Sequence, residues 1–213
     1  MYKFASCLIF GSSLLMPASG QATIINEIMQ NPAMVTDANG EWFELFNSGP
    51  FDVDINGWII ADDGSDSHTI NHNAPLLISR GGFLVLGRNT DPITNGGLNV
   101  DYGYSSFALA NSGDELILLD QFHTEIDRVA WDGGPVFSDP NGASMALIDP
   151  YSNNTLGANW STSTQIFGAG DSGTLGQCNT DVGQICNIIR VPEPTSLILL
   201  SIGLIGVGLF RRQ

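Results

Sequence analysis

Short apolar runs, each bounded by glycine, asparagine or aspartate, recur along the middle of the chain. Phe83–Gly87 and Glu115–Asp120 each hold four apolar residues in succession. Runs of this length between turn residues are typical of strands. No segment shows the 3.6-residue period of a convincing amphipathic helix, so the pattern predicts an all-β protein folded as a β-sandwich. The further candidate strands are Thr23–Met29, Glu41–Phe46, Gly57–Asp62, Glu125–Trp131 and Ser144–Ile148.

Two of these segments carry apolar residues on both faces. In Glu41–Phe46, alternate side chains point to opposite sides of the strand, and each side includes aromatic residues. One or both faces must therefore be covered. The continuous apolar run Trp58–Ile60 predicts a central strand that is buried on both faces.

The first 22 residues have the form of a secretory signal peptide. Lys3 precedes an apolar stretch from Phe4 to Met16, and small residues lead up to Ala22. We expect cleavage after Ala22, with Gly20 as the alternative. An amino-terminal membrane helix is disfavoured, because the apolar stretch is too short and ends at Pro17.

The last residues contain a second apolar stretch, which is long enough to cross a membrane. No residue from Pro194 to Phe210 is charged, and Arg211 and Arg212 follow directly. As a helix this stretch would be about 25 Å long, close to the lower limit for a single transmembrane helix. The basic pair would keep the carboxyl end in the cytoplasm.

Charge separates the central segment from both ends. Residues 23–190 carry 21 acidic side chains against four arginines, a formal net charge of −17, and no lysine. Such a surface repels phosphate backbones, so no direct nucleic-acid partner is expected. Cations and neutral glycans fit this surface better, although acidity also serves simply to keep an exported protein soluble.

Two cysteines remain once the signal peptide is removed. Cys178 and Cys186 form an even pair in an exported chain, which predicts a disulfide in a stalk spanning residues 176–190. The alternative is a metal ligand or a catalytic thiol, and it is weakened because no histidine lies near either cysteine in the sequence.

Six spaced segments together resemble the lamin tail domain. In chain order they are IINEIMQNP, EWFELFNSG, VDINGWIIADD, LLISRGGFLVLGRN, FALANSGDELILLD and EIDRVAWDG. The resemblance extends from Thr23 to about Trp160 and implies an immunoglobulin-like β-sandwich. No Pro-Gly turn follows Trp160, which leaves the end of the domain open, and we expect it near residue 175.

The tail, residues 191–213, closely resembles a PEP-CTERM sorting signal. Its parts are the triplet Pro192, Glu193 and Pro194, the apolar stretch, and the basic pair Arg211 and Arg212. The resemblance implies a Gram-negative bacterium, export across the inner membrane, and processing by exosortase near the triplet. A permanent single-span anchor is the alternative.

One acidic cluster is a candidate metal site. Asp62, Asp63 and Asp66 lie within one tight turn, and three carboxylates in such a turn can gather around Ca²⁺. A solvated hairpin tip explains the same residues. The chain shows no coherent catalytic set, so no cofactor is expected apart from this possible Ca²⁺.

These observations favour a non-catalytic module on the cell surface or in the extracellular matrix. We expect it to be held briefly at the inner membrane, processed by exosortase, and then to bind extracellular polymer, such as exopolysaccharide, or another surface protein. The alternative is a metal-dependent extracellular hydrolase or nuclease accessory that uses the acids of the candidate metal site. Fold resemblance alone does not decide between the two.

Overall fold

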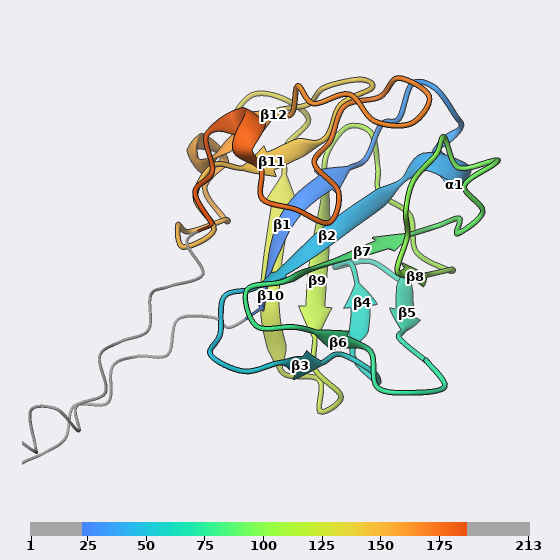
Figure 1. The fold of residues 1–213 in the computed structure, drawn as a ribbon, viewed down its shortest axis with the longest axis vertical. Helices are drawn as coiled ribbons and strands as arrows, with labels where there is room; N and C mark the ends of the chain where they lie inside the picture. The colour runs from blue at the N-terminus through green and yellow to red at the C-terminus, as the bar shows by residue number, and fades with distance from the viewer. Residues whose placement is uncertain (1–22, 187–213) are drawn as a thin grey trace, which may run out of the picture.

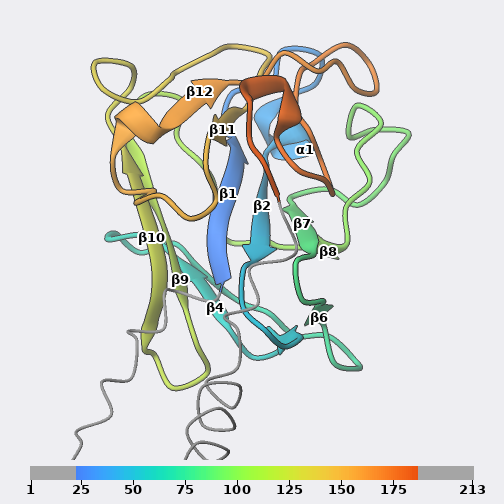
Figure 2. The ribbon, with the colours of Figure 1, turned by 60° about the vertical axis from the view of Figure 1, so that its left-hand side comes forward.

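The computed structural model describes residues 23–186, which form two main sheets packed face to face (Figure 1). The larger sheet has the order β12-β11-β1-β2-β7-β8, and only the β7–β8 pair is parallel. The smaller has the order β10-β9-β4-β5 and is antiparallel throughout. A two-stranded ribbon, β3-β6, completes the set. Figure 2 shows the β10-β9-β4 layer beside the β1-β2-β7 layer.

The structure confirms a mostly β protein, and its sheets are consistent with an immunoglobulin-like sandwich. Helix is limited to one four-residue α-helix and two 3₁₀ turns within residues 23–186. All seven strands expected from the sequence are present to within two residues at either end; the remaining five are short. The elements are β1 (Thr23–Met29), α1 (Asp37–Gly40), β2 (Trp42–Asn47), β3 (Val53–Asp54), β4 (Ile59–Ala61), β5 (Ser67–Thr69), β6 (Leu77–Ile78), β7 (Phe83–Gly87), β8 (Tyr102–Gly103), β9 (Asp114–Leu119), β10 (Glu125–Trp131), β11 (Met145–Leu147), η1 (Gly157–Asn159), β12 (Trp160–Thr162) and η2 (Thr180–Val182).

A β-bulge in β1 decides which of its side chains enter the core. Ile25 pairs with Leu45 and the next pair is Glu27 with Glu44, so Asn26 is the extra residue. Simple alternation from Ile25 would point Glu27 inward and Ile28 outward. The bulge shifts the alternation by one residue, as such insertions do, and Ile28 joins the core while Glu27 turns to the outer face.

Both faces of β1 and β2 are covered. Between the two sheets lies the main core, which includes Phe43 and Leu45 of β2. On the outer face a second cluster, around Trp42 and Val85, packs against Phe167 and Leu175 from the chain beyond β12. Gly173 allows this close approach, because a Cβ there would lie 2.7 Å from the Trp42 ring.

The expectation that Trp58–Ile60 is buried on both faces is wrong. Ile60 has no exposed surface, whereas Trp58 and Ile59 are only partly buried. β4 lies between β9 and β5 within the smaller sheet, and only its inner face meets the core. The apolar run therefore packs on one side and is half-exposed on the other.

The expected boundary at residue 175 does not match a break in packing. Asn179 and Gln184 are buried, and both bond to the backbone of β11. Residues 176–186 are therefore part of the domain rather than a stalk. Within residues 23–186, no helix has the length and apolar character needed to cross a membrane. The expected signal peptide and carboxyl-terminal helix lie outside the described residues.

Removing one core ring should cost much more stability than removing an exposed ring. Phe43 has no exposed surface, and Phe122 at the β9–β10 turn is 78% exposed. We expect Phe43→Ala to lower the free energy of unfolding by about 3–5 kcal/mol, and Phe122→Ala by less than about 0.5 kcal/mol. Urea unfolding of residues 23–186 measures both. Equal effects of the two changes would contradict the assignment of Phe43 to the core.

Candidate functional site

The acidic turn proposed as a metal site joins β4 to β5. Asp62 accepts the backbone N–H of Asp66 through Oδ1 at 3.0 Å, which closes the turn. Asp63 instead reaches across to β10, where its Oδ2 lies 2.7 Å from Nη1 of Arg128, and this hydrogen bond lowers the pKa of Asp63. The carboxylates of Asp62 and Asp63 thus bind different partners. Among residues 23–186, no three His, Cys, Asp or Glu side chains are arranged to hold a metal ion.

The two cysteines are joined, as expected. Cys178 and Cys186 form a disulfide with their Cα atoms 5.8 Å apart. The alternative of a free thiol or metal ligand is therefore wrong for this structure. The sorting residues Pro192, Glu193, Pro194, Arg211 and Arg212 lie outside the described part of the chain.

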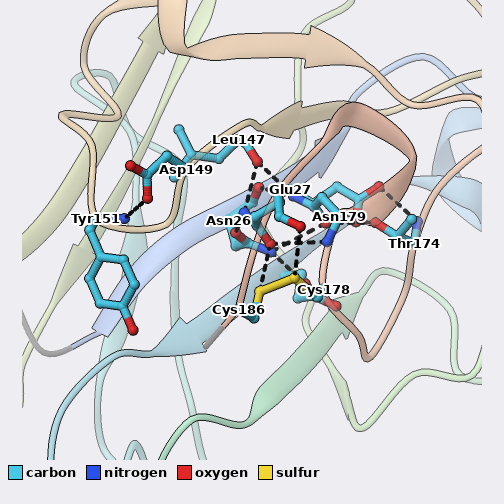
Figure 3. Close-up of a disulfide and its surroundings, with 11 residues drawn as sticks. Asn26, Glu27, Leu147, Asp149, Tyr151, Thr174, Cys178, Asn179 and Cys186 are labelled. Atoms are coloured by element: carbon cyan, nitrogen blue, oxygen red, sulfur yellow. Dashed lines mark hydrogen bonds between the residues drawn. A yellow bond between two sulfur atoms is a disulfide. The ribbon is translucent and has the colours of Figure 1, made fainter. Parts of the chain in front are cut away.

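The disulfide closes a loop, residues 178–186, that is docked on the larger sheet (Figure 3). Asn179 donates through Nδ2 to the carbonyls of Asn26 and Leu147, at 3.1 and 3.2 Å. Gln184 donates through Nε2 to Oδ1 of Asn26 and to the carbonyl of Leu147, both at 2.7 Å. Because β1 and β11 are neighbours, these two amides fasten the disulfide loop across both strands.

Two fully buried acids lie beneath the segment that leads into this loop. Glu27 and Glu44 are direct cross-strand neighbours on β1 and β2, and neither has any exposed surface. Thr174 donates its backbone N–H to Oε1 of Glu27 at 2.9 Å, and its hydroxyl oxygen lies 2.7 Å from Oε2 of the same side chain. Gly176 donates its N–H to Glu44 at 2.5 Å. The outer face of the central strands is thus closed by polar contacts as well as by apolar ones.

The remaining partners of the pair are neutral. Ser144 donates its hydroxyl to Oε1 of Glu27 at 2.5 Å, and Asn26 donates through Nδ2 to Oε1 of Glu44 at 2.9 Å. Burial raises the pKa of Glu27 to about 7, against hydrogen bonds from Ser144 and Thr174 that lower it. Burial and the neighbouring Glu27 raise the pKa of Glu44 well above its usual range.

A third buried acid ties the two sheets together. Asp127, in β10, accepts the backbone N–H of Ile25 in β1 at 2.6 Å and Nδ2 of Asn154 at 2.7 Å, both through Oδ2. Asn154 also bonds to the carbonyl of Ile25, at 3.3 Å. This contact joins the edge of the smaller sheet to a central strand of the larger one.

Sequence reasoning did not single out these buried acids. The signal was present, because Glu27 interrupts the apolar run TIINEIM and Glu44 interrupts EWFELF. A charged residue within an otherwise apolar strand is rarely buried without partners. Apart from Asn26, however, the partners of Glu27 and Glu44 come from residues more than a hundred positions later, and no local pattern reveals them.

The raised pKa of Glu27 makes the domain more stable at acidic pH than at alkaline pH. In the folded state Glu27 keeps its proton up to about pH 7, whereas in the unfolded chain it loses the proton near pH 4.5. The contribution of this proton to the free energy of unfolding is therefore fully present below pH 4.5. It is lost as the pH rises through 7, by roughly 3 kcal/mol. Glu41, whose pKa burial also raises to about 7, contributes in the same direction.

Urea unfolding of residues 23–186 at pH 5 and pH 8 measures this loss. Glu27→Gln removes the titrating group and should leave a clearly smaller difference between the two pH values. Wild-type protein whose stability increases from pH 5 to pH 8 would contradict the assignment. Both pH values lie above the range in which Asp63 and Asp181, with lowered pKa values, would take up protons.

Comparison with known families agrees with both resemblances. A family described as Lamin Tail Domain matches residues 17–133, and a PEP-CTERM protein-sorting motif matches residues 190–213. No curated protein matches the chain. The first match contains β1 to β10, whereas β11, β12 and the disulfide loop lie beyond it. The second implies an extracellular protein of a Gram-negative bacterium that is sorted by exosortase to the cell envelope or surface. Since the first match covers more than half of the chain, this protein belongs to the Lamin Tail Domain family.

Proposed function

We propose that this protein is a non-catalytic surface or matrix module that is exported, held briefly at the inner membrane, and released by exosortase. Once released, it binds extracellular polymer or another surface protein through its sandwich. The observation that carries this proposal is the sorting motif at residues 190–213, which follows directly after a domain whose last residues are packed and closed by a disulfide. A disulfide suits an oxidising compartment outside the cytoplasm.

The chemistry of the tail supports a transient anchor. Pro192 and Pro194 favour extended backbone on either side of Glu193, which would leave this acid accessible at the membrane surface. The apolar stretch is at the short limit for a stable span, and the basic pair after it fixes the carboxyl end inside. A permanent anchor needs the span and the basic end, but it has no use for the triplet.

The described side chains support a binding role over a catalytic one. His68 accepts the backbone N–H of Ser105 through Nδ1, and its Nε2 lies 2.8 Å from the hydroxyl of Tyr102. This histidine is thus held between two structural partners. Glu27 and Glu44 face the packed segment 174–176 and not solvent.

Two exposed rings on connecting loops offer a contact surface. Phe51 and Phe122 are 77% and 78% exposed, on the loop before β3 and on the β9–β10 turn. Asp120 accepts the backbone N–H groups of Phe122 and Thr124 through one oxygen, both at 2.8 Å, which fixes the turn that carries the ring. Exposed rings provide apolar contact, while the acidic surface disfavours polyanions. A neutral polymer therefore suits this surface best.

Processing near Glu193 should be visible as a shortened chain. Intact-mass analysis of the exported protein should show an end near Pro194. Glu193→Ala, or deletion of exosortase, should leave the longer form in the membrane, because the enzyme would lack its recognition triplet or be absent. Glu125→Ala, which removes one acidic side chain within the domain, serves as the control and should be processed normally. A mature protein that ends at Gln213 in a host with working exosortase would make the tail an ordinary anchor.

Polymer binding should depend on the exposed rings. We expect the purified domain to bind the exopolysaccharide of its own host, and Phe51→Ala together with Phe122→Ala to weaken binding at least about tenfold, since hot-spot aromatics typically contribute more than 1.4 kcal/mol. Ile93→Ala, at a 90% exposed position on the loop between β7 and β8, is the matched control and should bind like wild type. Undiminished binding by the double variant would exclude the rings from the contact.

A further inference from the structure

Three oxygen atoms form a line that connects β1 to the disulfide loop. Oε2 of Glu27 lies 2.7 Å from Oγ1 of Thr174, and this Oγ1 lies 2.6 Å from Oδ1 of Asn179. All three residues are buried, and Figure 3 shows them beside the disulfide. Two oxygens approach this closely only when a proton lies between them.

The orientation of the Asn179 amide is fixed by its other contacts. Its Nδ2 donates to two backbone carbonyls, those of Asn26 and Leu147, which can only accept. Its Oδ1 therefore faces Thr174 and must accept a proton from it. The hydroxyl of Thr174 has a single proton, and this contact uses it.

The second short contact then needs a proton from Glu27. Oε1 of Glu27 accepts both the Ser144 hydroxyl and the backbone N–H of Thr174, so this oxygen has the partners of an acceptor. Oε2 is left to donate to Thr174. Counted in this way, Glu27 is the neutral acid, and its proton starts a relay from Glu27 through Thr174 to Asn179.

We propose that this relay is a proton-dependent latch that holds the disulfide loop, residues 178–186, on the larger sheet. With Glu27 protonated, each of the two short contacts holds one proton and the loop is closed. When Glu27 loses its proton, the Thr174 hydroxyl turns back to the carboxylate. Oδ1 of Asn179 then faces an oxygen lone pair at 2.6 Å, and the loop loosens.

Within residues 23–186, the titratable groups that act on Glu27 and Glu44 are acidic. Glu44 faces Glu27 from β2, Asp181 acts on it from η2, and Asp101 acts on Glu44 from the loop before β8. Ser144, beside β11, contributes only a hydroxyl. The hydrogen-bond partners of both glutamates among residues 23–186 are neutral, so none of them balances the negative charge that Glu27 would carry after losing its proton. This arrangement opposes ionisation of Glu27 and makes its proton a requirement for the closed loop.

Hydrogen exchange followed by mass spectrometry tests the latch on residues 23–186. Peptides that span residues 172–186 are compared at pH 6 and pH 8.5, after correction for the intrinsic pH dependence of exchange. We expect wild-type protection to fall at least tenfold at pH 8.5, because the pH then lies more than one unit above the pKa of about 7. Amides of β9 report global unfolding. They lose protection together with the global stability described above, but at pH 8.5 they should stay clearly better protected than the loop.

Two variants separate the latch from a general loss of stability. Glu27→Gln places a permanent N–H donor where the proton lies, and it should keep the loop protected at both pH values. Thr174→Val removes the middle of the relay, and it should leave the loop poorly protected at both while β9 stays protected. The proposal would be overturned by wild-type loop protection that is the same at pH 6 and 8.5, or by equal protection of the loop and β9 at pH 8.5. A Glu27→Gln response like wild type, or full loop protection in Thr174→Val, would also overturn it.

Discussion

The position of one extra residue in β1 determines how the rest of the domain is assembled. Because Asn26 bulges, Ile25 and Ile28 both enter the core, and Glu27 turns outward next to Glu44. Without the bulge, Glu27 would point between the sheets, where a carboxyl without partners costs several kcal/mol. The bulged residue is itself used, since its side chain binds Glu44 and Gln184. A departure from regular pairing thus supplies both a continuous core and a polar anchoring surface.

Turning two acids to the outer face creates a requirement for a cover. Glu27 and Glu44 lie on central strands beside Trp42 and Val85, so the outer face is neither fully apolar nor open to water. Residues 173–184 meet both needs, with Leu175 over the apolar part and backbone N–H donors over the acids. In the chain-entropy model a loop as short as that from Cys178 to Cys186 gains about 2.5 kcal/mol from its disulfide. That gain offsets part of the cost of ordering a segment without regular strands.

The sequence allowed the sandwich and most of its strands to be predicted, because strand pattern and turn residues are local signals. It did not allow the outer layer to be predicted. The alternation rule treats TIINEIM as regular, and the bulge at Asn26 depends on pairing with β2, which is not local. The run Trp58–Ile60 misled for a related reason, since apolar content alone does not tell a central strand covered on both sides from one with a half-exposed face. The last part of the chain over this face, residues 176–186, resembles a linker in composition, and only its contacts with Asn26 and Leu147 show that it is folded.

The packed cover also limits the chain between the domain and the sorting motif. Cys186 belongs to the folded loop, and Pro192 of the triplet follows six residues later. Even fully extended, six residues reach only about 20 Å, which is less than the thickness of the bilayer's hydrocarbon core. On the proposed route, exosortase therefore meets the triplet with the folded domain close to the membrane surface. The strong negative charge of that domain disfavours contact with anionic lipid head groups. The short linker thus keeps the domain near the membrane, while its charge favours a larger distance. On that route, cleavage near Glu193 would remove the tether that holds the charged domain near the membrane, so charge repulsion would favour its release.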